Sequence, residues 1–353
     1  MTLKVLYIEH LRNLAKIRTA LHPHLNIITG VNGSGKTSFL EAIFLLGCGR
    51  SFRTREITTL ITHGNPDLTV YAKTIDDQRI AIRKSLNAPT IMRLNDSPCE
   101  SASELARFLP TQIFYQDIFQ IIDAGPAIRR SLLDWGLFHV KQNYFEIWKN
   151  YRRALKQRNS LLRHRTGAGV LRPWNKILSE LAHEMDIMRQ EYLVDLNQQF
   201  QKVLISLSDI GCNLQYYKGW DRRGENKSLE MVLTESLAVD LQYQYTRYGS
   251  HQAELLLSSH DRKLKHYLSR GQQKIVLFAL KIAQAQLVNR FCVFLIDDLF
   301  AELDDRHIAR LMDYISTSKG QFFITCHESS LITPSLALNE HIQITLPYDN
   351  CFT

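Results

Sequence analysis

Residues 30–37 read Gly30-Val31-Asn32-Gly33-Ser34-Gly35-Lys36-Thr37 and fit G-x-x-x-x-G-K-S/T, the pattern of the phosphate-binding P-loop. A short apolar run, Leu25 to Thr29, precedes the loop and predicts a buried strand. Apolar residues at helical spacing follow between Phe39 and Leu46 and predict a helix. A strand, a glycine-rich loop and a helix in this order direct backbone N–H groups toward a phosphate, so we expect a nucleotide here.

Each residue type in the loop has a physical reason. Glycines allow backbone conformations and a close approach that a Cβ atom would block. Lys36 supplies a positive charge for the β- and γ-phosphates, and the Thr37 hydroxyl is available to Mg²⁺. The expected nucleotide-contacting residues of this segment are Gly30, Val31, Asn32, Gly33, Ser34, Gly35, Lys36, Thr37 and Ser38.

Length and composition bound the class of protein. The 353 residues suffice for roughly two domains, and a hydrophobic content of 45% can supply their cores. The apolar run 291–296 is too short to span a bilayer, and the first residues lack a signal peptide's apolar segment, so we expect a cytoplasmic protein with no membrane partner. The cysteines are scattered without a C-x-x-C pair, which favours reduced thiols over a metal site.

The net charge of +8 favours a polyanionic partner, nucleic acid first, although charge alone also fits a basic protein without one. One concentration of charge is the loop after the P-loop helix, which carries Arg50, Arg53 and Arg55. This loop is either a solvated basic segment or a source of arginines near the nucleotide or a nucleic-acid backbone.

From about residue 141 the apolar residues fall on a 4,3 alternation that skips only Arg158, breaks at 166–169 and then resumes. This pattern predicts two antiparallel helices packed as a short coiled-coil hairpin, the first of about 23 residues and roughly 35 Å. The first helix is basic, and four cations share one face at i, i+3, i+4 and i+7: Lys149, Arg152, Arg153 and Lys156. They either pair with acidic residues of the returning helix or form a ridge that follows DNA phosphates.

A second apolar strand, residues 291–296, ends in Asp297 and Asp298, as a Walker B strand does. If it runs parallel to the P-loop strand, its carboxyl end meets the phosphates. We expect Asp297 to hold Mg²⁺ and Asp298 to orient or deprotonate the attacking water. Asp298 has a shorter side chain than the Glu found there in most ABC-type ATPases, which suits a slow, switch-like ATPase.

Residues 268–274 resemble the L-S-G-G-Q signature of ABC-type ATPases and open an apolar helix. The expected contacts are a helix cap from Ser269 and a close approach at Gly271, with the positive helix end facing an anion. In ABC-type ATPases this motif contacts the nucleotide of the opposite subunit, which implies a dimer. The nucleotide-binding residues carried over are Ser269, Arg270, Gly271 and Gln272, with Arg270 in place of a glycine.

Two shorter segments complete this likeness. Residues 301–304 (AELD) resemble the D-loop, and His327, at the end of a further strand, resembles the switch histidine. His327 is accordingly expected to join Lys36 and Asp298 in catalysis, although an ordinary strand-end histidine is the alternative.

Taken in order, these motifs resemble the RecF family of bacterial recombination-repair ATPases, relatives of the SMC-like ATPases. Further marks of the resemblance are the segments 11–14 (LRNL), 49–53 (GRSFR), 125–130 (GPAIRR) with Leu133-Asp134, 156–159 (KQRN) and 268–272 (LSRGQ). The chain departs from the family at Gln116, where a proline is usual, and at 249–252 (GSHQ), where Gly-Pro-His-Arg is common. The resemblance places Gln116 in the loop that senses the γ-phosphate.

The resemblance implies an α/β fold: an ABC-type ATPase head with mixed sheets and flanking helices, plus an inserted, mainly helical arm. We expect the head at 1–115 and 245–353 and the arm at 116–244. The family implies ATP and Mg²⁺ as cofactors, an ATP-dependent homodimer, weak DNA-dependent ATP hydrolysis, and binding of double-stranded DNA and single-strand junctions. RecR and RecO are its implied partners in loading the recombinase RecA, in replication, repair, recombination and the SOS response at the nucleoid.

The sequence gives less support to two other functions. An ATP-binding subunit of a membrane transporter would not need the basic hairpin among the more than 230 residues between Lys36 and Ser269. A metabolic P-loop kinase would leave the signature helix unexplained.

Overall fold

The computed structural model describes residues 2–221, 224–259, 262–298, 302–326 and 341–346. The chain divides into two compact units, described separately below. The first unit comprises Met1–Ile118, Ser206–Ser208 and Val288–Thr353, and the second comprises Phe119–Ile205 and Asp209–Leu287.

This division differs from the expected one over residues 245–287, which lie in the second unit and not with the head. The physical reason is packing: β10 (Glu254–Ser259) pairs with β9 (Asn213–Tyr217), and α10 (Arg270–Leu287) packs on α4 (Pro126–Val140). These long-range pairings carry the signature segment into the second unit.

A five-stranded parallel sheet forms one layer of the first unit, in the order β14-β3-β13-β12-β8. Every residue of four of these strands is buried, as expected for strands covered on both faces. Because the strands are parallel, the segments after β3, β12 and β8 emerge at one edge. The strand bounds are His341–Thr345 (β14), Leu25–Thr29 (β3), Gln321–Cys326 (β13), Val293–Ile296 (β12) and Thr111–Phe114 (β8).

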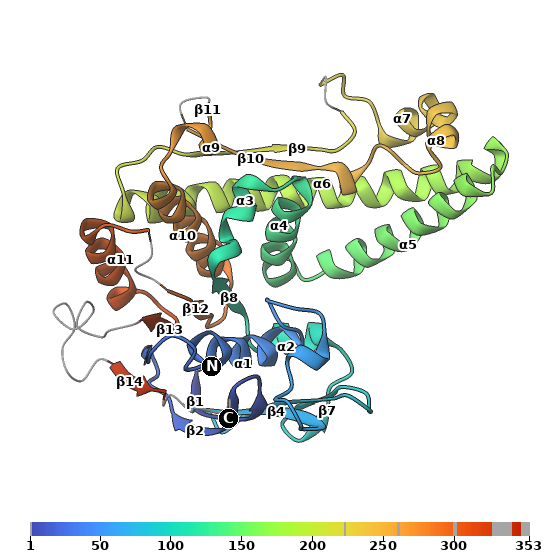
Figure 1. The fold of residues 1–353 in the computed structure, drawn as a ribbon. Coiled ribbons are helices and arrows are strands. Elements are labelled where there is room, and N and C mark those ends of the chain that lie inside the picture. Colours follow the sequence, from blue (N-terminus) through green and yellow to red (C-terminus); the bar gives the residue numbers. More distant parts are fainter. Residues whose placement is uncertain (1, 222–223, 260–261, 299–301, 327–340, 347–353) are drawn as a thin grey trace. The chain divides into compact units, whose positions relative to one another are not determined.

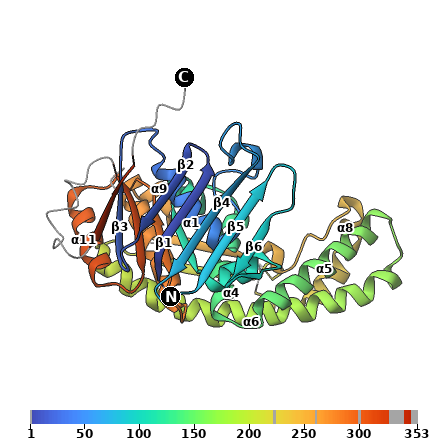
Figure 2. The same cartoon turned by 90° about the horizontal axis from the view of Figure 1, so that it is seen from below.

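A six-stranded antiparallel sheet forms the second layer, and α1 (Lys36–Cys48) lies against strands of both sheets (Figures 1 and 2). Buried and more exposed residues alternate along β4, so one face of this sheet packs on α1 and the other faces outward. In sheet order, the strands are Leu14–Ala20 (β2), Leu3–Leu11 (β1), Asp67–Thr74 (β4), Arg79–Ser85 (β5), Ile91–Leu94 (β6) and Ser97–Pro98 (β7).

Short helices complete the first unit. The first turn of α2 is closed by a capping box, in which Ser101 and Glu104 satisfy each other's backbone N–H groups. Asp304 caps α11 by accepting a hydrogen bond from the backbone N–H of His307 at 2.8 Å. The bounds are Ile57–Thr59 (η1), Ala102–Phe108 (α2), Gln116–Phe119 (η2) and Asp305–Thr317 (α11).

The second unit is mainly helical, with a small sheet in the order β11-β10-β9. Its longest helices are α5 (Tyr144–Arg163) and α6 (Ala168–Leu207), joined through residues 164–167 (Figure 1). The two helices match the predicted hairpin elements, and their coiled-coil packing stays a prediction. The remaining bounds are Gln120–Asp123 (α3), Leu229–Glu235 (α7), Leu237–Tyr243 (α8), Ser250–Gln252 (η3), Arg262–Lys263 (β11) and Leu264–Tyr267 (α9). Every helix within the described ranges is too short or too polar to cross a bilayer.

Arg158, which interrupts the 4,3 alternation, is fully buried. Its guanidinium donates to Asp240 at 2.8 Å, to the Thr246 hydroxyl at 2.7 Å and to Asn175 at 2.7 Å. Asp240 and Thr246 lie outside the hairpin, so this position of α5 faces more than its partner helix. The break in the pattern therefore marks a buried polar contact and not a solvent-exposed turn.

Candidate functional site

The P-loop follows β3 and leads into α1. Gly30 has φ 153° and Gly35 has φ 99°, a region that side chains with a Cβ atom seldom adopt. A Cβ atom at Gly30 would lie 2.4 Å from the Ser34 Oγ, and one at Gly35 would lie 2.5 Å from the Leu14 Cδ2. The two glycines are therefore required by conformation and by space.

Two side chains of the loop suit a phosphate ligand. The Lys36 Nζ donates to the backbone carbonyl oxygens of Gly30 at 2.7 Å and Val31 at 3.0 Å, which holds the ammonium group over the loop. Ser34 Oγ is buried and has no hydrogen-bond partner among the described residues. A buried hydroxyl without a partner is costly, and a phosphate oxygen would satisfy it.

The expected magnesium residues lie in contact. Thr37 Oγ1 donates to both carboxylate oxygens of Asp297 at 3.0 Å. Burial raises the pKa of Asp297, against the hydrogen bonds from Thr325 and Thr37 that lower it. A hydroxyl and a carboxylate beside a P-loop fit Mg²⁺, which prefers oxygen ligands and shares them with substrate phosphates. Within the described ranges no cluster of three His, Cys, Asp or Glu side chains could cage a metal.

Thr325 is a site residue that sequence reasoning missed. Its hydroxyl donates to Asp297 Oδ1 at 2.8 Å and accepts a hydrogen bond from the backbone N–H of Asp298 at 2.8 Å. It lies near the end of β13, which runs between β3 and β12. The available signal was the polar Thr325 within the apolar run 322–326 that precedes His327.

The structure describes some of the other expected site residues and not others. Asp298 is exposed, and its φ of 50° is unusual for a residue with a side chain. Gln116 begins η2 one residue after the end of β8, at the same edge of the parallel sheet as the P-loop. His327 and residue 301 of the predicted D-loop lie outside the described residues.

A buried carboxylate explains two of the sequence marks. Glu41 on α1 is fully buried, pairs with the Arg12 guanidinium and accepts a hydrogen bond from the Ser51 hydroxyl. The next residue of the same turn, Asn13, donates to the Gly33 carbonyl oxygen at 2.8 Å and accepts from the Ser38 hydroxyl at 3.1 Å. The segments 11–14 and 49–53 therefore hold the P-loop and its helix in place.

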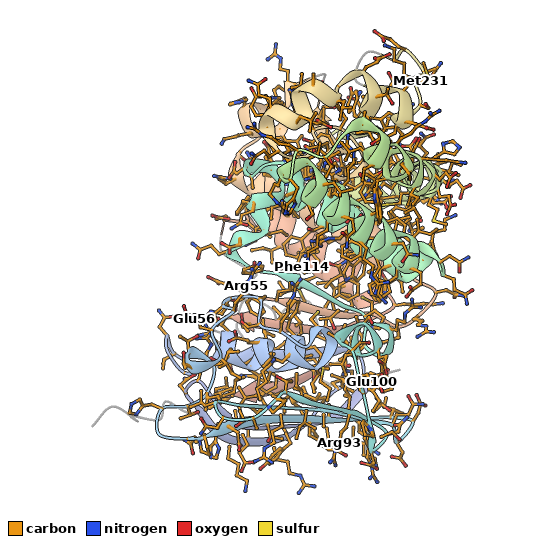
Figure 3. The ribbon with its side chains drawn as sticks, turned by 90° about the vertical axis from the view of Figure 1, so that its right-hand side faces the viewer. Arg55, Glu56, Arg93, Glu100, Phe114 and Met231 are labelled. Carbon is orange, nitrogen blue, oxygen red and sulfur yellow. The ribbon has the colours of Figure 1, made fainter. Side chains whose placement is uncertain are left out.

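The arginine loop lies on the surface of the first unit. Arg53 approaches Glu41 at 4.0 Å, and its charge acts to lower the pKa of Asp297, which places it near the metal residues. Arg50 and Arg55 are exposed, and Figure 3 labels Arg55 beside Glu56. Contact of this loop with a nucleotide or with a nucleic-acid backbone stays a prediction.

The signature segment belongs to the second unit. The Ser269 Oγ accepts a hydrogen bond from the Gln272 backbone N–H at 3.3 Å, and the Gln272 side chain accepts one from the Ser269 backbone N–H at 3.0 Å. This reciprocal cap confirms the predicted helix start at Ser269. Arg270 pairs with Asp123 at 2.8 Å and lies 4.8 Å from the Phe119 ring centroid.

Three of the four cations on the basic face of α5 are exposed, and Lys149 is half-buried. Arg152, Arg153 and Lys156 have no carboxylate within 4.0 Å in the described parts of the chain. Lys149 pairs within its own helix with Glu146 at 3.8 Å, and Arg152 stacks on Trp148 at 4.8 Å. Cross-helix pairing thus does not account for this face, which leaves its charges available to a ligand.

Other family marks meet in a buried polar cluster of the second unit. Arg189 donates to Asp134 at 2.9 Å and to the Ser250 carbonyl oxygen at 2.9 Å. The Tyr151 hydroxyl contacts the Nδ1 of His251 at 2.7 Å, and burial lowers the pKa of His251 to about 4. A histidine neutral at physiological pH in this setting has a structural role.

Comparisons with known proteins agree with this geometry. A family model of the RecF/RecN/SMC N terminal domain matches residues 2–347. The chain is similar to the DNA replication and repair protein RecF of Chromohalobacter salexigens, with 40% identity over 327 residues that cover 90% of each chain. It is similar to the protein of that name from Pseudomonas syringae pv. tomato, with 37% identity over 342 residues covering 94% of this chain and 92% of the relative.

Solved structures give the same result. The chain is similar to the recombination mediator protein RecF-ATP of the RecFOR pathway, with a TM-score of 0.82 and 27% identity over 93% of this chain and 92% of the other. The Smc head bound to the C-winged helix domain of ScpA shares the fold, with a TM-score of 0.57 and 18% identity over 94% of this chain and 91% of the other.

Proposed function

Because the chain belongs to the RecF family of DNA replication and repair proteins, we propose that it is an ATP-dependent DNA-binding protein of recombinational repair. ATP draws two heads together, the dimer holds duplex DNA near single-strand gaps, and slow hydrolysis resets it. The observation that carries this proposal is the contact of Thr37, Asp297 and Thr325 beside the P-loop.

The chain's own residues divide the work of nucleotide binding. The P-loop backbone and Lys36 neutralise phosphate charge, and Ser34 supplies a buried hydroxyl. Thr37 and Asp297 would hold Mg²⁺, which supplies charge stabilisation to the transferred phosphoryl group. Asp298 orients or deprotonates the attacking water, and His327 and Gln116 report on the γ-phosphate.

Dimerisation follows from the second half of the site. Ser269 and Arg270 are exposed at the start of α10, where a capped helix N-terminus offers backbone N–H groups to an anion. In the proposed dimer this segment, with Gly271 and Gln272, binds the nucleotide of the partner subunit. ATP is then the link between the subunits, and its hydrolysis separates them.

The exposed cations of α5 are the proposed duplex-binding surface, with Arg50, Arg53 and Arg55 as a second candidate. Cations without carboxylate partners can neutralise DNA phosphates and release counterions. Partners of the RecR and RecO families would then use the DNA-bound dimer to load the recombinase at the nucleoid, in the cytoplasm.

One salt titration tests the proposal. Affinity for a blunt duplex is measured at several salt concentrations, with ATP and Mg²⁺ and without nucleotide, for the parent protein and for Arg152→Glu/Arg153→Glu/Lys156→Glu. We expect ATP to raise the affinity, and the triple variant to lower it and to flatten the log–log salt slope by about 0.9 for each lost phosphate contact.

The exposed Lys319→Glu, in a turn of the first unit, is the matched control and should leave the slope close to that of the parent. Equal affinity for the duplex with and without ATP would contradict the ATP-gated function. A triple variant with the parent slope contradicts the role of the α5 face and leaves the arginine loop as the duplex surface.

A further inference from the structure

The outward face of the antiparallel sheet carries aligned arginine and tyrosine side chains that the nucleotide site does not use. Strand register places Arg18, Tyr7, Tyr71, Ala81 and Arg93 side by side on β2, β1, β4, β5 and β6. Neighbouring strands lie about 4.8 Å apart, so this arginine–tyrosine row spans roughly 19 Å. An arginine stands at each end, and two tyrosines lie between them.

Strand parity puts the row on the face opposite α1. Leu6 and Ile8 flank Tyr7, Val70 and Ala72 flank Tyr71, and all four flanking residues are buried in the core. Figure 2 looks onto the outward face, and no described element of the first unit lies in front of its central strands. Figure 3 labels Arg93 on this outer side of the sheet.

The two arginines that end the row are exposed, and within the described ranges neither Arg18 nor Arg93 has a carboxylate within 4.0 Å. Three other cations of the same face do have acidic partners, in the pairs Lys73–Asp77, Arg79–Asp96 and Arg83–Asp67. The paired cations are partly neutralised, so the unpaired positive charge of this face includes both ends of the row and Lys16 beside Tyr7.

The rings between the arginines are accessible from outside the sheet. Tyr7 and Tyr71 occupy directly opposed positions on β1 and β4, and both are half-buried. The ammonium nitrogen of Lys16 lies 6.0 Å from the Tyr7 ring centroid. The outward face of this ring is therefore open enough to interact with a cation. Aromatic rings on an open sheet are platforms on which unpaired bases stack.

We propose that the arginine–tyrosine row binds single-stranded nucleic acid, with bases stacked on Tyr7 and Tyr71 and phosphates on Arg18 and Arg93. The major groove is about 12 Å wide and admits a helix or a two-stranded ribbon, which is narrower than this five-stranded row, whereas the unstacked bases of a single strand can reach the rings. The proposal rests on the proposed function, because it assigns the single-stranded side of a gap to a surface separate from the α5 face.

The test measures the affinity of a labelled oligo-dT, an abasic strand of equal length and a blunt duplex, all with ATP and Mg²⁺. Tyr7→Leu/Tyr71→Leu removes two stacked bases and should weaken oligo-dT binding at least about thirtyfold, the lower end of base–aromatic stacking for two bases, and leave the abasic strand and the duplex unchanged. Arg18→Gln/Arg93→Gln should flatten the oligo-dT salt slope by about 1.4, or about 0.7 for each phosphate. Circular dichroism and thermal melting establish that each variant is folded.

Lys319→Gln is the matched control, and the exposed arginine pair keeps the test decisive if the tyrosine variant fails to fold. Oligo-dT binding that survives both double substitutions overturns the proposal. So does an abasic strand that binds the parent as tightly as oligo-dT, since that indicates a charged surface of the kind an acidic protein could use. If the parent protein shows no ATP-dependent duplex binding, the proposed function is contradicted instead. The two failures are therefore distinguishable.

Discussion

At the scale of single residues, the site depends on polar side chains that are costly to bury. Asp297 is the clearest case, because burial raises its pKa while two threonine hydroxyls hold it in place. A carboxyl group whose folded-state pKa is raised favours folding at low pH, and this contribution is lost as the pH rises through the folded pKa. At neutral pH Asp297 therefore lowers the stability of the nucleotide-free protein.

We therefore expect Asp297→Asn to raise the free energy of unfolding of the nucleotide-free protein at pH 7, on the order of 1 kcal/mol, and with it the melting temperature. The gain should shrink as the pH falls toward 3.8, the ordinary value for this group, because the parent carboxyl becomes protonated. Melting curves between pH 4 and 7, with ATP and Mg²⁺ as a second condition, measure this. A variant less stable than its parent at pH 7 would contradict the burial argument.

Thr325 links Asp297 to the backbone of Asp298, so its hydroxyl should be needed for hydrolysis. Thr325→Val removes both hydrogen bonds at nearly constant volume and should lower kcat about tenfold or more, as loss of charge-assisted hydrogen bonds does. Thr325→Ser keeps the hydroxyl and is the matched control. Equal kcat for the two variants would show that the hydroxyl has no role in turnover.

At the scale of elements, the P-loop strand and helix, the Walker B strand and the helix start at Ser269 were all predictable, because local patterns define them. Thr325 was not, because its position depends on the order of strands far apart in the sequence. The burial of Arg189 was equally hidden, since a buried arginine and an exposed one look alike in the sequence of a helix. Arg158 was visible only as the residue that interrupts the 4,3 alternation. The compact units differ from the expected boundary near 245 because β10 pairs with β9, and both strands lie in the second unit.

The buried pair between Arg158 and Asp240 fixes α5 against α8. Removing one partner leaves an uncompensated buried charge, so Arg158→Met should lower the free energy of unfolding by about 3–5 kcal/mol. Arg158→Met/Asp240→Leu replaces both and should recover most of that loss. Urea unfolding of the two variants tests this, and a double variant no more stable than the single one would contradict it.

At the scale of the whole molecule, the proposed dimer has its two half-sites on different chains. Ser269→Arg should leave ATP binding near the parent value and abolish ATP-dependent dimers, whereas Lys36→Ala should abolish both. Mixing the two inactive variants creates one intact site per heterodimer, so part of the ATPase activity should return. Light scattering and phosphate release measure these outcomes, and a mixture as inactive as its parts would contradict a shared site.

α1 is buried between the two sheets, with the nucleotide loop at its start and the antiparallel sheet along its flank. A fully packed helix cannot shift against one layer without disturbing the other. If ATP raises the affinity of the outer sheet face for single-stranded DNA, thermodynamic reciprocity requires that this DNA raise the affinity for ATP by the same factor. The protein would then retain its nucleotide longest where unpaired DNA is present. Its residence time on DNA would increase with the length of single strand in the gap.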